Sequence, residues 1–512
     1  MAISRKKIVS VVVAVVILIS ICLVVIVLKP WSNDNNKTES DNVGQDPNIL
    51  MDYINTRDDT YAYTTLHEST QRDEREGFTS YVLNMTSQQW FTSEYSDRDV
   101  WWHYVIITVP DAIVYKDLGL LFVSSGSNDN GLPDPLTDVE CRLISHMAST
   151  LGVVTAVLKQ VPNEPITFTN DPERKSRSGA SIIAYTLRAI LEGTVDEYHS
   201  IALFPMVKSV VRAMDTVTNF TDQSVTRFYV SGAAERGWVT WLTAAVDDRI
   251  VGIAPLVYGN LNFVKNLKHQ QRSLGGYSWG ISPYWEQNIT HYIDEPTRES
   301  ILSVLEPLAY NKFLTMPKYI VLSSNDEQYM PDCTKYFYQS MKEPVFLRIY
   351  PNTDNSLLGS WNRMVNDFTG FILSVEEKWP LPDVRWNLTE TDLAVTVSIK
   401  TNLRPLSFTK WVADTPTDAR RDFRLRIAKS VNMSESIPQS VLFQKTKTDD
   451  PGVEFETTLA KPTNGWVGIF IEIVFPAPNG THFTVTTDMS VIPDVYPLEE
   501  ECSGDSCVGR LV

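Results

Sequence analysis

The strongest local indication of the fold is the stretch Thr226-Arg-Phe-Tyr-Val-Ser-Gly232-Ala-Ala234-Glu-Arg-Gly237-Trp-Val-Thr-Trp-Leu242. Its first part, Arg227–Val230, predicts a buried strand, and Gly237–Val246 predicts a helix. Between them lies a short turn of small residues. A strand that turns sharply into a helix is the architecture of a nucleophile elbow, which exposes one side chain above a sheet. On local grounds an ordinary strand–helix turn explains the pattern equally well.

On either side of this stretch, strand candidates alternate with helical patterns. The strand candidates are Val100–Val109, Leu118–Val123, Gly152–Leu158, Ile250–Pro255, Tyr319–Ser323 and Phe346–Tyr350. This alternation predicts one α/β domain over residues 49–379, with a mostly parallel sheet covered by helices on both faces. After Trp379, short alternating runs separated by Pro, Gly, Asn and Asp predict a small β-sandwich over 380–497. Residues 498–512 follow as a C-terminal tail.

Several short motifs, in a fixed order, carry a resemblance to a known family. They are Trp101–Tyr104, Ser125–Asn128, Gln160–Asn163, Pro205–Lys208, Val211–Val217, Gly232–Trp241, Asp248-Arg249, Met316–Lys318, Asn325–Glu327 and Tyr350–Asn352. With these motifs the chain resembles the PhoPQ-activated pathogenicity-related protein family, which includes the autocrine proliferation repressor A proteins. The resemblance covers about residues 50–375. It implies an α/β-hydrolase-like fold and an elbow of the pattern G-x-S-K-R-G-W.

Two positions of that elbow differ from the family pattern. Ala234 stands at the serine position and Glu235 at the lysine position. A methyl group cannot attack a carbonyl carbon, so covalent catalysis by serine is excluded at this turn. The acid of a triad is expected after a late strand, where Asp326 fits and Asp332 is the alternative.

The histidine position has changed as well. The family places its histidine in the pattern P-N-x-x-H, and here the matching stretch ends at Asn355. A triad in the order serine, acid, histidine needs a histidine after the acid. Among the seven histidines, His482 alone follows Asp326, and it lies in the predicted β-sandwich. The expected triad positions Ala234, Asp326 and Asn355 therefore form a degenerate site.

Two other stretches contain serines that could belong to a catalytic site. Ser125, Gly126 and Ser127 follow a strand where an oxyanion loop would lie, and we expect them, together with Glu235, to border a pocket. Gly276-Tyr-Ser-Trp-Gly280 matches G-x-S-x-G literally, but neither a buried strand nor a good helix start surrounds it. We interpret it as part of a lid-like insertion.

Residues 1–48 predict a membrane anchor and a stalk. Arg5-Lys6-Lys7 precede an apolar run from Ile8 to Leu28. A helix of this length spans roughly 30 Å, the thickness of a bilayer core. The basic flank places residues 1–7 in the cytoplasm. This pattern predicts a type II signal-anchor over 8–28 and a flexible stalk over 29–48, at the plasma membrane or along the secretory pathway. The alternative, a cleaved signal peptide, would release the protein.

Two patterns agree with an extracellular or lumenal body. N-x-[ST] sequons for glycosylation occur at Asn36, Asn84, Asn219, Asn288, Asn387, Asn432 and Asn479. Outside the apolar run, the cysteines are Cys141, Cys333, Cys502 and Cys507, an even number that fits two disulfides. Short spacing favours Cys502–Cys507, which would leave Cys141–Cys333.

Composition excludes one class of partner. The net charge is −17, and no basic run occurs beyond the N-terminal Arg5-Lys6-Lys7. Nucleic-acid binding needs clustered Lys and Arg, so we expect no nucleic-acid partner. No Cys/His spacing resembles a zinc site, and we expect neither a metal nor another cofactor.

These observations favour a non-catalytic pseudo-hydrolase, a membrane glycoprotein with a binding or signalling role toward a protein or small-molecule partner. Analogy with the family suggests proliferation repression. One alternative is an active serine-type hydrolase, of the esterase or peptidase class, with an unorthodox constellation around Asp326, Asp332 or Ser278. Another is a purely structural glycoprotein, which a filled pocket beside Ala234 would favour.

Overall fold

The computed structural model describes residues 48–512, apart from 196–197 and 450–451. The expected cytoplasmic segment, the signal-anchor, nearly all of the stalk and the Asn36 sequon lie outside the described residues. Within them, no helix combines the length and the apolar character needed to cross a bilayer. The described residues belong to one compact unit.

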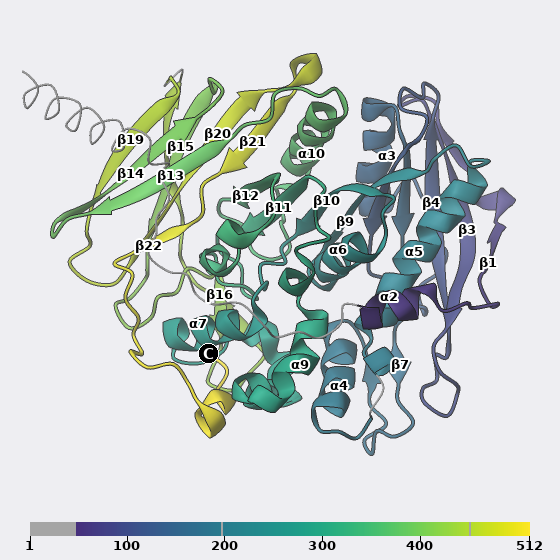
Figure 1. The fold of residues 1–512 in the computed structure, drawn as a ribbon, viewed down its shortest axis with the longest axis horizontal. Helices are drawn as coiled ribbons and strands as arrows, with labels where there is room; N and C mark the ends of the chain where they lie inside the picture. Colours follow the sequence, from purple (N-terminus) through teal and green to yellow (C-terminus); the bar gives the residue numbers. More distant parts are fainter. Residues whose placement is uncertain (1–47, 196–197, 450–451) are drawn as a thin grey trace, which may run out of the picture. The chain divides into compact units, whose positions relative to one another are not determined.

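A ten-stranded sheet forms the centre of this unit (Figure 1). Its main part is a row of parallel strands, in the order β6 (Val154–Leu158), β5 (Leu118–Val123), β9 (Arg227–Ala233), β10 (Ile250–Leu256), β11 (Lys318–Ser323) and β12 (Val345–Tyr350). Strands β5, β6, β11 and β12 are buried along their whole length. Continuous burial is expected when helices cover both faces of a parallel sheet. The predicted mostly parallel sheet is therefore confirmed.

One edge of the sheet is antiparallel. Strand β4 (Val100–Pro110) pairs with β6, and β3 (Phe78–Gln89) pairs with β4. The short strands β1 (Ala62–Thr65) and β2 (Gln71–Asp73) both pair with β3. Side chains of β3 alternate between buried and half-exposed along much of the strand, as expected where one face meets solvent.

Helices cover both faces of the sheet (Figure 1). One face packs against α3 (Val139–Leu151) and α10 (Trp361–Glu376). The other packs against α5 (Leu203–Phe220) and α6 (Glu235–Val246), and α2 (Asn48–Asn55) lies on these two helices. Helix α4 (Ala180–Leu191) joins the same core through the helices of the insertion. Between β10 and β11 the chain forms an insertion, which contains α7 (Phe263–Leu274), η3 (Trp279–Ile281), α8 (Ser282–Glu286), η4 (Ile289–Asp294) and α9 (Pro296–Leu305).

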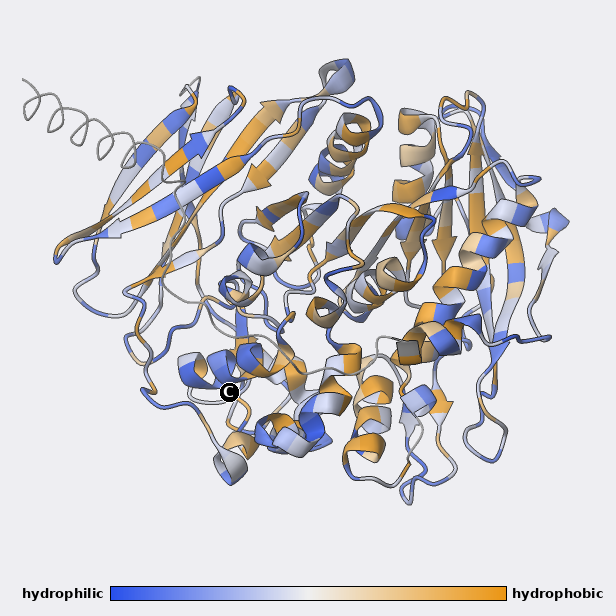
Figure 2. Cartoon of the chain, in the orientation of Figure 1, coloured by the Kyte–Doolittle hydropathy of each residue, from blue (hydrophilic) through white to orange (hydrophobic). Residues whose placement is uncertain are grey.

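Antiparallel strands dominate after residue 380. One sheet contains β13 (Val384–Glu390), β14 (Ala394–Thr401) and β19 (Glu454–Ala460). The other contains β18 (Gln444–Asp449), β15 (Ser407–Asp414), β20 (Val467–Pro476), β21 (His482–Thr486) and β22 (Ser490–Ile492). Phe408 of β15 stacks on Phe455 of β19, so the two sheets pack face to face. Hydrophobic and hydrophilic residues alternate along several of these strands (Figure 2). The domain boundary at residue 380 stays a prediction.

One of the two expected disulfides is wrong. Cys502 and Cys507 are bonded, as their spacing predicted. Cys141 and Cys333 are both free and buried. Cys141 lies on α3 and belongs to the core on one face of the sheet, whereas Cys333 belongs to the core on the opposite face. The sheet therefore separates the two sulfur atoms, and a disulfide needs Cα atoms within about 7 Å of each other.

Candidate functional site

The candidate site lies at the carboxyl ends of the parallel strands. Strand β5 stands between β6 and β9, so the chain passes to one side of β5 first and to the other side afterwards. The loops after β5 and β9 therefore leave the sheet in opposite directions. Ligands of open α/β sheets bind at such a switch point. Ser125, Gly126 and Ser127 follow β5, and Ala234 follows β9.

Ala234 is the single residue between β9 and α6, and its backbone is strained. Its φ is 52° and its ψ is −120°, a region that non-glycine residues rarely adopt. The Ala234 N–H donates to the carbonyl oxygen of Leu256 at 3.0 Å. A Cβ on Gly232 would lie 2.7 Å from the Arg236 carbonyl oxygen, and one on Gly237 would lie 2.9 Å from the Leu256 carbonyl oxygen. The turn has the geometry of an elbow, with a methyl group at its apex.

Asp326 and Asn355 meet in the loops after β11 and β12. Asn355 Nδ2 donates to Asp326 Oδ2 at 2.9 Å. The backbone N–H groups of Gln328 and Tyr329 donate to Asp326 Oδ1 at 2.7 and 3.0 Å. Asparagine Nδ2 and histidine Nδ1 are both bonded to Cγ, so they reach equally far from the backbone. Asn355 thus supplies the donor that faces the acid but lacks the distal nitrogen that would accept a proton.

The end of β10 links this pair to the elbow. Asn355 Nδ2 also contacts the Val257 carbonyl oxygen at 3.4 Å. Val257 follows Leu256, the backbone partner of Ala234. Its φ is 43°, an outlier for a β-branched residue. Backbone strain of this kind clusters at functional sites, and the sequence gives no sign of it at Val257.

Asp332, the alternative acid, belongs to a different cluster. His269 Nε2 contacts Asp332 Oδ1 at 2.8 Å, and Arg421 contacts Asp332 Oδ2 at 2.6 Å. The charges of Arg421 and His269 outweigh the effect of burial and hold the pKa of Asp332 well below its ordinary value. Asp326 is therefore the carboxylate that the structure brings to Asn355.

A buried acid, Asp326, and a half-buried one, Glu327, stand side by side at the site. Asp326 is 3% exposed, and Glu327 Oε2 accepts the Asn355 N–H at 3.0 Å. Burial, reinforced by the neighbouring Glu327 carboxylate, raises the pKa of Asp326 well above its ordinary value. Burial also raises the pKa of Glu327. Protonation of the pair is favoured because two carboxylates in one desolvated place repel each other.

Two acids lie next to the elbow, Glu235, which the sequence pointed to, and Glu164, which it did not. Glu235 is 7% exposed and pairs with Arg236 at 3.1 Å. Glu164 accepts the N–H of Gly179, and burial raises the pKa of its carboxyl group. The charges of Glu235 and Arg236 act on the pKa of Glu164 in opposite directions. No local pattern marks Glu164, because it joins the elbow only through the fold.

Tyrosines contribute to the same surroundings. The rings of Tyr258 and Tyr329 meet edge to face at 5.4 Å, and Tyr258 stacks on Trp238 of α6. Burial raises the pKa values of Tyr258, Tyr329 and Tyr284, and the charge of Glu235 raises them further. The Tyr258 hydroxyl is buried and has no hydrogen-bond partner among the residues that the structure describes. An aromatic and acidic wall therefore lies next to the elbow.

An amide network fixes the loop after β5. Gln160 Nε2 donates to Asn128 Oδ1 at 2.6 Å, and Asn128 Nδ2 donates to Asn163 Oδ1 at 3.1 Å. Asn163 donates to the Trp102 carbonyl oxygen, and the Tyr104 N–H donates to Gln160 Oε1 at 2.9 Å. Three family-like stretches that lie far apart in the sequence thus meet at one end of the sheet.

Two small cavities occur in the part of the chain that the structure describes. One lies between α3 and α10, and the other is lined by Trp238, Tyr258, Phe263 and Glu306, among others. Each has a volume of about 10 Å³, room for about one water molecule. Neither is lined by Ala234, which is only 7% exposed.

Ser278 of the literal G-x-S-x-G match is fully buried. Its hydroxyl donates to the Glu327 carbonyl oxygen and accepts from Arg424 at 2.9 Å. No strand leads into this stretch, and the short η3 follows Ser278. These contacts place Ser278 in the packing of the insertion, away from an elbow.

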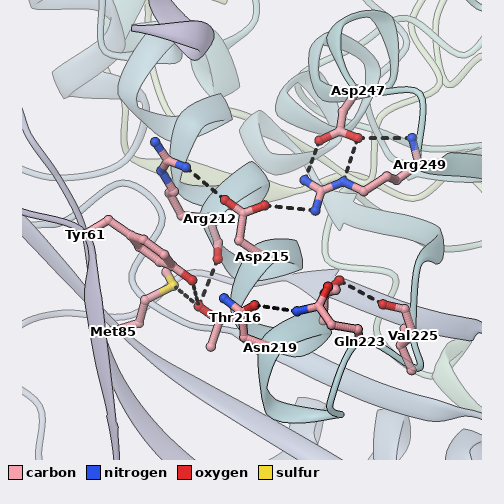
Figure 3. Close-up of polar contacts among 11 residues, drawn as sticks. Tyr61, Met85, Arg212, Asp215, Thr216, Asn219, Gln223, Val225, Asp247 and Arg249 are labelled. Atoms are coloured by element: carbon pink, nitrogen blue, oxygen red, sulfur yellow. Dashed lines mark hydrogen bonds and ion pairs between the residues drawn. The ribbon is translucent and has the colours of Figure 1, made fainter. Parts of the chain in front are cut away.

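Two other family-like stretches meet between α5 and the turn after α6 (Figure 3). Asp215 of α5 accepts from Arg212 at 2.9 Å and from Arg249 at 2.8 Å, while Arg249 also pairs with Asp247 at 2.7 Å. This network joins α5 to the turn after α6. The stretch Val211–Val217 therefore serves helix packing.

Comparison with known proteins places the chain in a family. The family described as PhoPQ-activated pathogenicity-related protein matches residues 50–424. Autocrine proliferation repressor protein A of Dictyostelium discoideum is 31% identical over 484 residues, which cover 90% of this chain and 94% of that protein.

Solved structures offer a looser likeness. Acetyl xylan esterase 1 from Thermoanaerobacterium is 14% identical, with a TM-score of 0.42 and coverage of 63% of this chain and 91% of that one. An S-formylglutathione hydrolase from Agrobacterium tumefaciens is 11% identical, with a TM-score of 0.39 and coverage of 62% and 100%. The mostly parallel sheet and the elbow after β9 make the fold α/β-hydrolase-like. Because the family matches most of the chain and a relative is similar over nearly its whole length, the chain belongs to the PhoPQ-activated pathogenicity-related protein family.

Proposed function

We propose that the protein is a disarmed hydrolase that binds a partner. The observation that carries this proposal is the hydrogen bond of 2.9 Å from Asn355 Nδ2 to Asp326 Oδ2. Asn355 holds the acid as a histidine would, yet its amide nitrogen cannot accept a proton. The apex of the elbow carries the Ala234 methyl group, which cannot form a covalent intermediate. General-base assistance alone contributes about 10²–10⁴-fold to a rate, so the joint loss leaves little hydrolysis.

The proposed location is the cell surface or the secretory lumen, with the apolar run 8–28 as a type II anchor. Exposure of the sequons supports it. The asparagine side chains of the six sequons within the described residues are all exposed, at Asn84, Asn219, Asn288, Asn387, Asn432 and Asn479. A glycan is bulky and needs such a position. The Cys502–Cys507 disulfide agrees with an oxidising compartment.

The proposed role is binding or signalling toward a protein or small molecule. It rests on analogy with the Dictyostelium relative, whose name describes an autocrine proliferation repressor. A fold often persists after its chemistry is lost, and function then depends on the residues around the old site. Here Glu235, Glu164 and the three tyrosines supply an acidic and aromatic wall beside the elbow.

A second candidate is an active hydrolase with an unorthodox constellation. The neighbouring acids Asp326 and Glu327, whose pKa values are both raised, favour it, because such pairs mark many catalytic sites. A nucleophile is harder to assign. Ser278 is buried, and its hydroxyl is already bonded to Glu327 and Arg424.

A turnover assay separates the two candidates. Full-length protein is assayed against panels of esters and peptides beside the double variant Ala234→Ser/Asn355→His. We expect no turnover by the wild type above the rate without protein, and measurable ester hydrolysis by the double variant. The single variants serve as matched controls, and each should stay far below the double variant because the two groups act together. Turnover by the wild type would contradict the proposal.

A further inference from the structure

The C-terminal segment is docked in a specific way. Residues 498–512, here called the strap, include η9 (Gly504–Val508) and are closed on themselves by the Cys502–Cys507 disulfide. At the end of the strap, Leu511 is 1% exposed and Val512 is 2% exposed. Both aliphatic side chains are therefore packed almost completely against the rest of the protein.

Backbone groups hold the end of the strap from both sides. On one side, the Tyr277 N–H donates to the Arg510 carbonyl oxygen at 2.7 Å, and the Val512 N–H donates to the Tyr277 carbonyl oxygen at 2.8 Å. On the other side, the Asn432 N–H donates to the Leu511 carbonyl oxygen, and the Leu511 N–H donates to Asn432 Oδ1, both at 3.0 Å. An extended peptide held in this way is recognised mainly through its main chain.

Glycines shape the contact. A Cβ on Gly276 would lie 2.5 Å from the Arg510 carbonyl oxygen and 2.9 Å from a methyl group of Val512. Gly509 has a φ of 59°, and a Cβ there would lie 2.6 Å from the Tyr277 ring. Close approach of two backbones thus accounts for the first glycine of the G-x-S-x-G match, which catalysis at Ser278 does not.

Donors of the insertion hold the rest of the strap. Tyr277 hydroxyl donates to the Cys507 carbonyl oxygen at 2.8 Å. Trp285 Nε1 and Thr290 Oγ1 both donate to the Val508 carbonyl oxygen, at 3.0 and 3.1 Å. These donors meet two consecutive carbonyl groups, which the adjacent disulfide helps to present.

Hydrogen bonds also connect the strap, through two side chains, to the neighbour of Asp326 in the candidate site. Arg424 donates to the Val512 carbonyl oxygen and to the Ser278 hydroxyl, both at 2.9 Å. Ser278 in turn donates to the carbonyl oxygen of Glu327, the neighbour of Asp326. A continuous line of hydrogen bonds therefore joins the strap to the loop 325–329, here called the acid loop.

We propose that Tyr277, Ser278, Arg424 and Asn432 form a peptide-binding groove, and that the strap is its resident ligand. The groove takes a short extended peptide with two adjacent aliphatic side chains. When the strap leaves, Arg424 loses its acceptor on Val512 while it still contacts Ser278, and the acid loop opens more often. This inference does not depend on whether the site at Ala234 is catalytic.

The test uses the full chain with Leu511→Asp/Val512→Asp, which would place two unpaired carboxylates in the groove and expel the strap. A fluorescent, oxidised synthetic peptide of the sequence 498–512 is titrated against it and followed by anisotropy. We expect binding to this variant at least tenfold tighter than to the wild type, whose groove is filled. Val495→Asp, at a side chain 53% exposed, is the matched control and should behave as the wild type does. A folded double variant that does not bind the peptide would overturn the groove.

Hydrogen exchange provides a second test if the double variant does not fold. In Cys502→Ser/Cys507→Ser, we expect faster exchange than in the wild type at the amides of Tyr277 and Val512. The amides of Gln328 and Tyr329, which donate to Asp326, should also exchange faster, while Val230 in the central strand β9 stays unchanged. Unchanged exchange in the strap and the acid loop would contradict their coupling.

Discussion

Asn355 donates a hydrogen bond of 2.9 Å to Asp326 through the nitrogen atom that stands where a histidine would carry Nδ1. The acid therefore keeps its partner although the base is absent. This substitution preserves the local structure because an amide and an imidazole place their first nitrogen at the same reach. The same substitution removes the second ring nitrogen, which in a histidine would accept the proton of a serine at position 234.

The first prediction concerns the stability that this bond supplies. Asn355→Ala leaves a buried carboxyl group without its side-chain donor, and we expect the free energy of unfolding to fall by about 1–3 kcal/mol. Denaturant unfolding measures the change, with Asn130→Ala in an exposed loop as the control. Equal stability of the two variants would mean that the Asn355 bond contributes nothing.

The second prediction concerns pH. Burial raises the pKa of Glu327 in the folded state, so its contribution to stability is complete below its unfolded pKa of about 4.3 and is lost as pH rises through the raised value. Glu327→Gln removes this loss. We expect the variant to gain stability relative to the wild type as pH rises above about 4, measured by denaturant unfolding across a pH series. Glu94→Gln, at an exposed side chain, should show no such trend.

The third prediction concerns the two glycines of the elbow. A methyl group on Gly237 would lie 2.9 Å from the Leu256 carbonyl oxygen, and one on Gly232 would lie 2.7 Å from that of Arg236. We expect Gly232→Ala and Gly237→Ala each to destabilise the protein by about 1–3 kcal/mol. Thermal unfolding is compared with Gly131→Ala, where no atom lies within 4 Å of the added carbon. If Gly232→Ala and Gly237→Ala melted at the same temperature as Gly131→Ala, the turn would tolerate the added methyl groups.

The fourth prediction concerns glycans. In a secretory expression host, the protein should gain electrophoretic mobility after enzymatic removal of N-linked glycans, because the described sequon asparagines are exposed. Replacing Asn432 by Gln should remove one glycan and leave the rest. Identical mobility before and after the enzyme would argue against the proposed lumenal or extracellular location.

Local patterns predicted the parts of the fold that are fixed by neighbouring residues. Leu118–Val123 forms β5 with the predicted bounds, and the turn at Ala234 lies where its small residues indicated. The strand expected from Gly152 begins instead at Val154, because Gly152 is the left-handed cap that ends α3. The strand β5 and the turn at Ala234 could be predicted because residues close in sequence determine both.

Contacts between segments far apart in the sequence could not be predicted from local patterns. The pairing Cys141–Cys333 was wrong because the face of the sheet on which a cysteine lies depends on the assembled fold. Sequence left Asp326 and Asp332 as alternatives, and only the three-dimensional position of Asn355 distinguishes them. Likewise, the partner of Gly276 is Arg510, more than two hundred residues away.

The central claim is that two side-chain changes disarm an otherwise intact hydrolase site. A serine-directed phosphonate probe tests it most directly, applied to the wild type, Ala234→Ser, Asn355→His and the double variant, with peptide mapping of the labelled residue. We predict no labelling of the wild type and stoichiometric labelling of the double variant at residue 234. Labelling of the wild type at any serine would contradict the account and would reveal the nucleophile of an active enzyme.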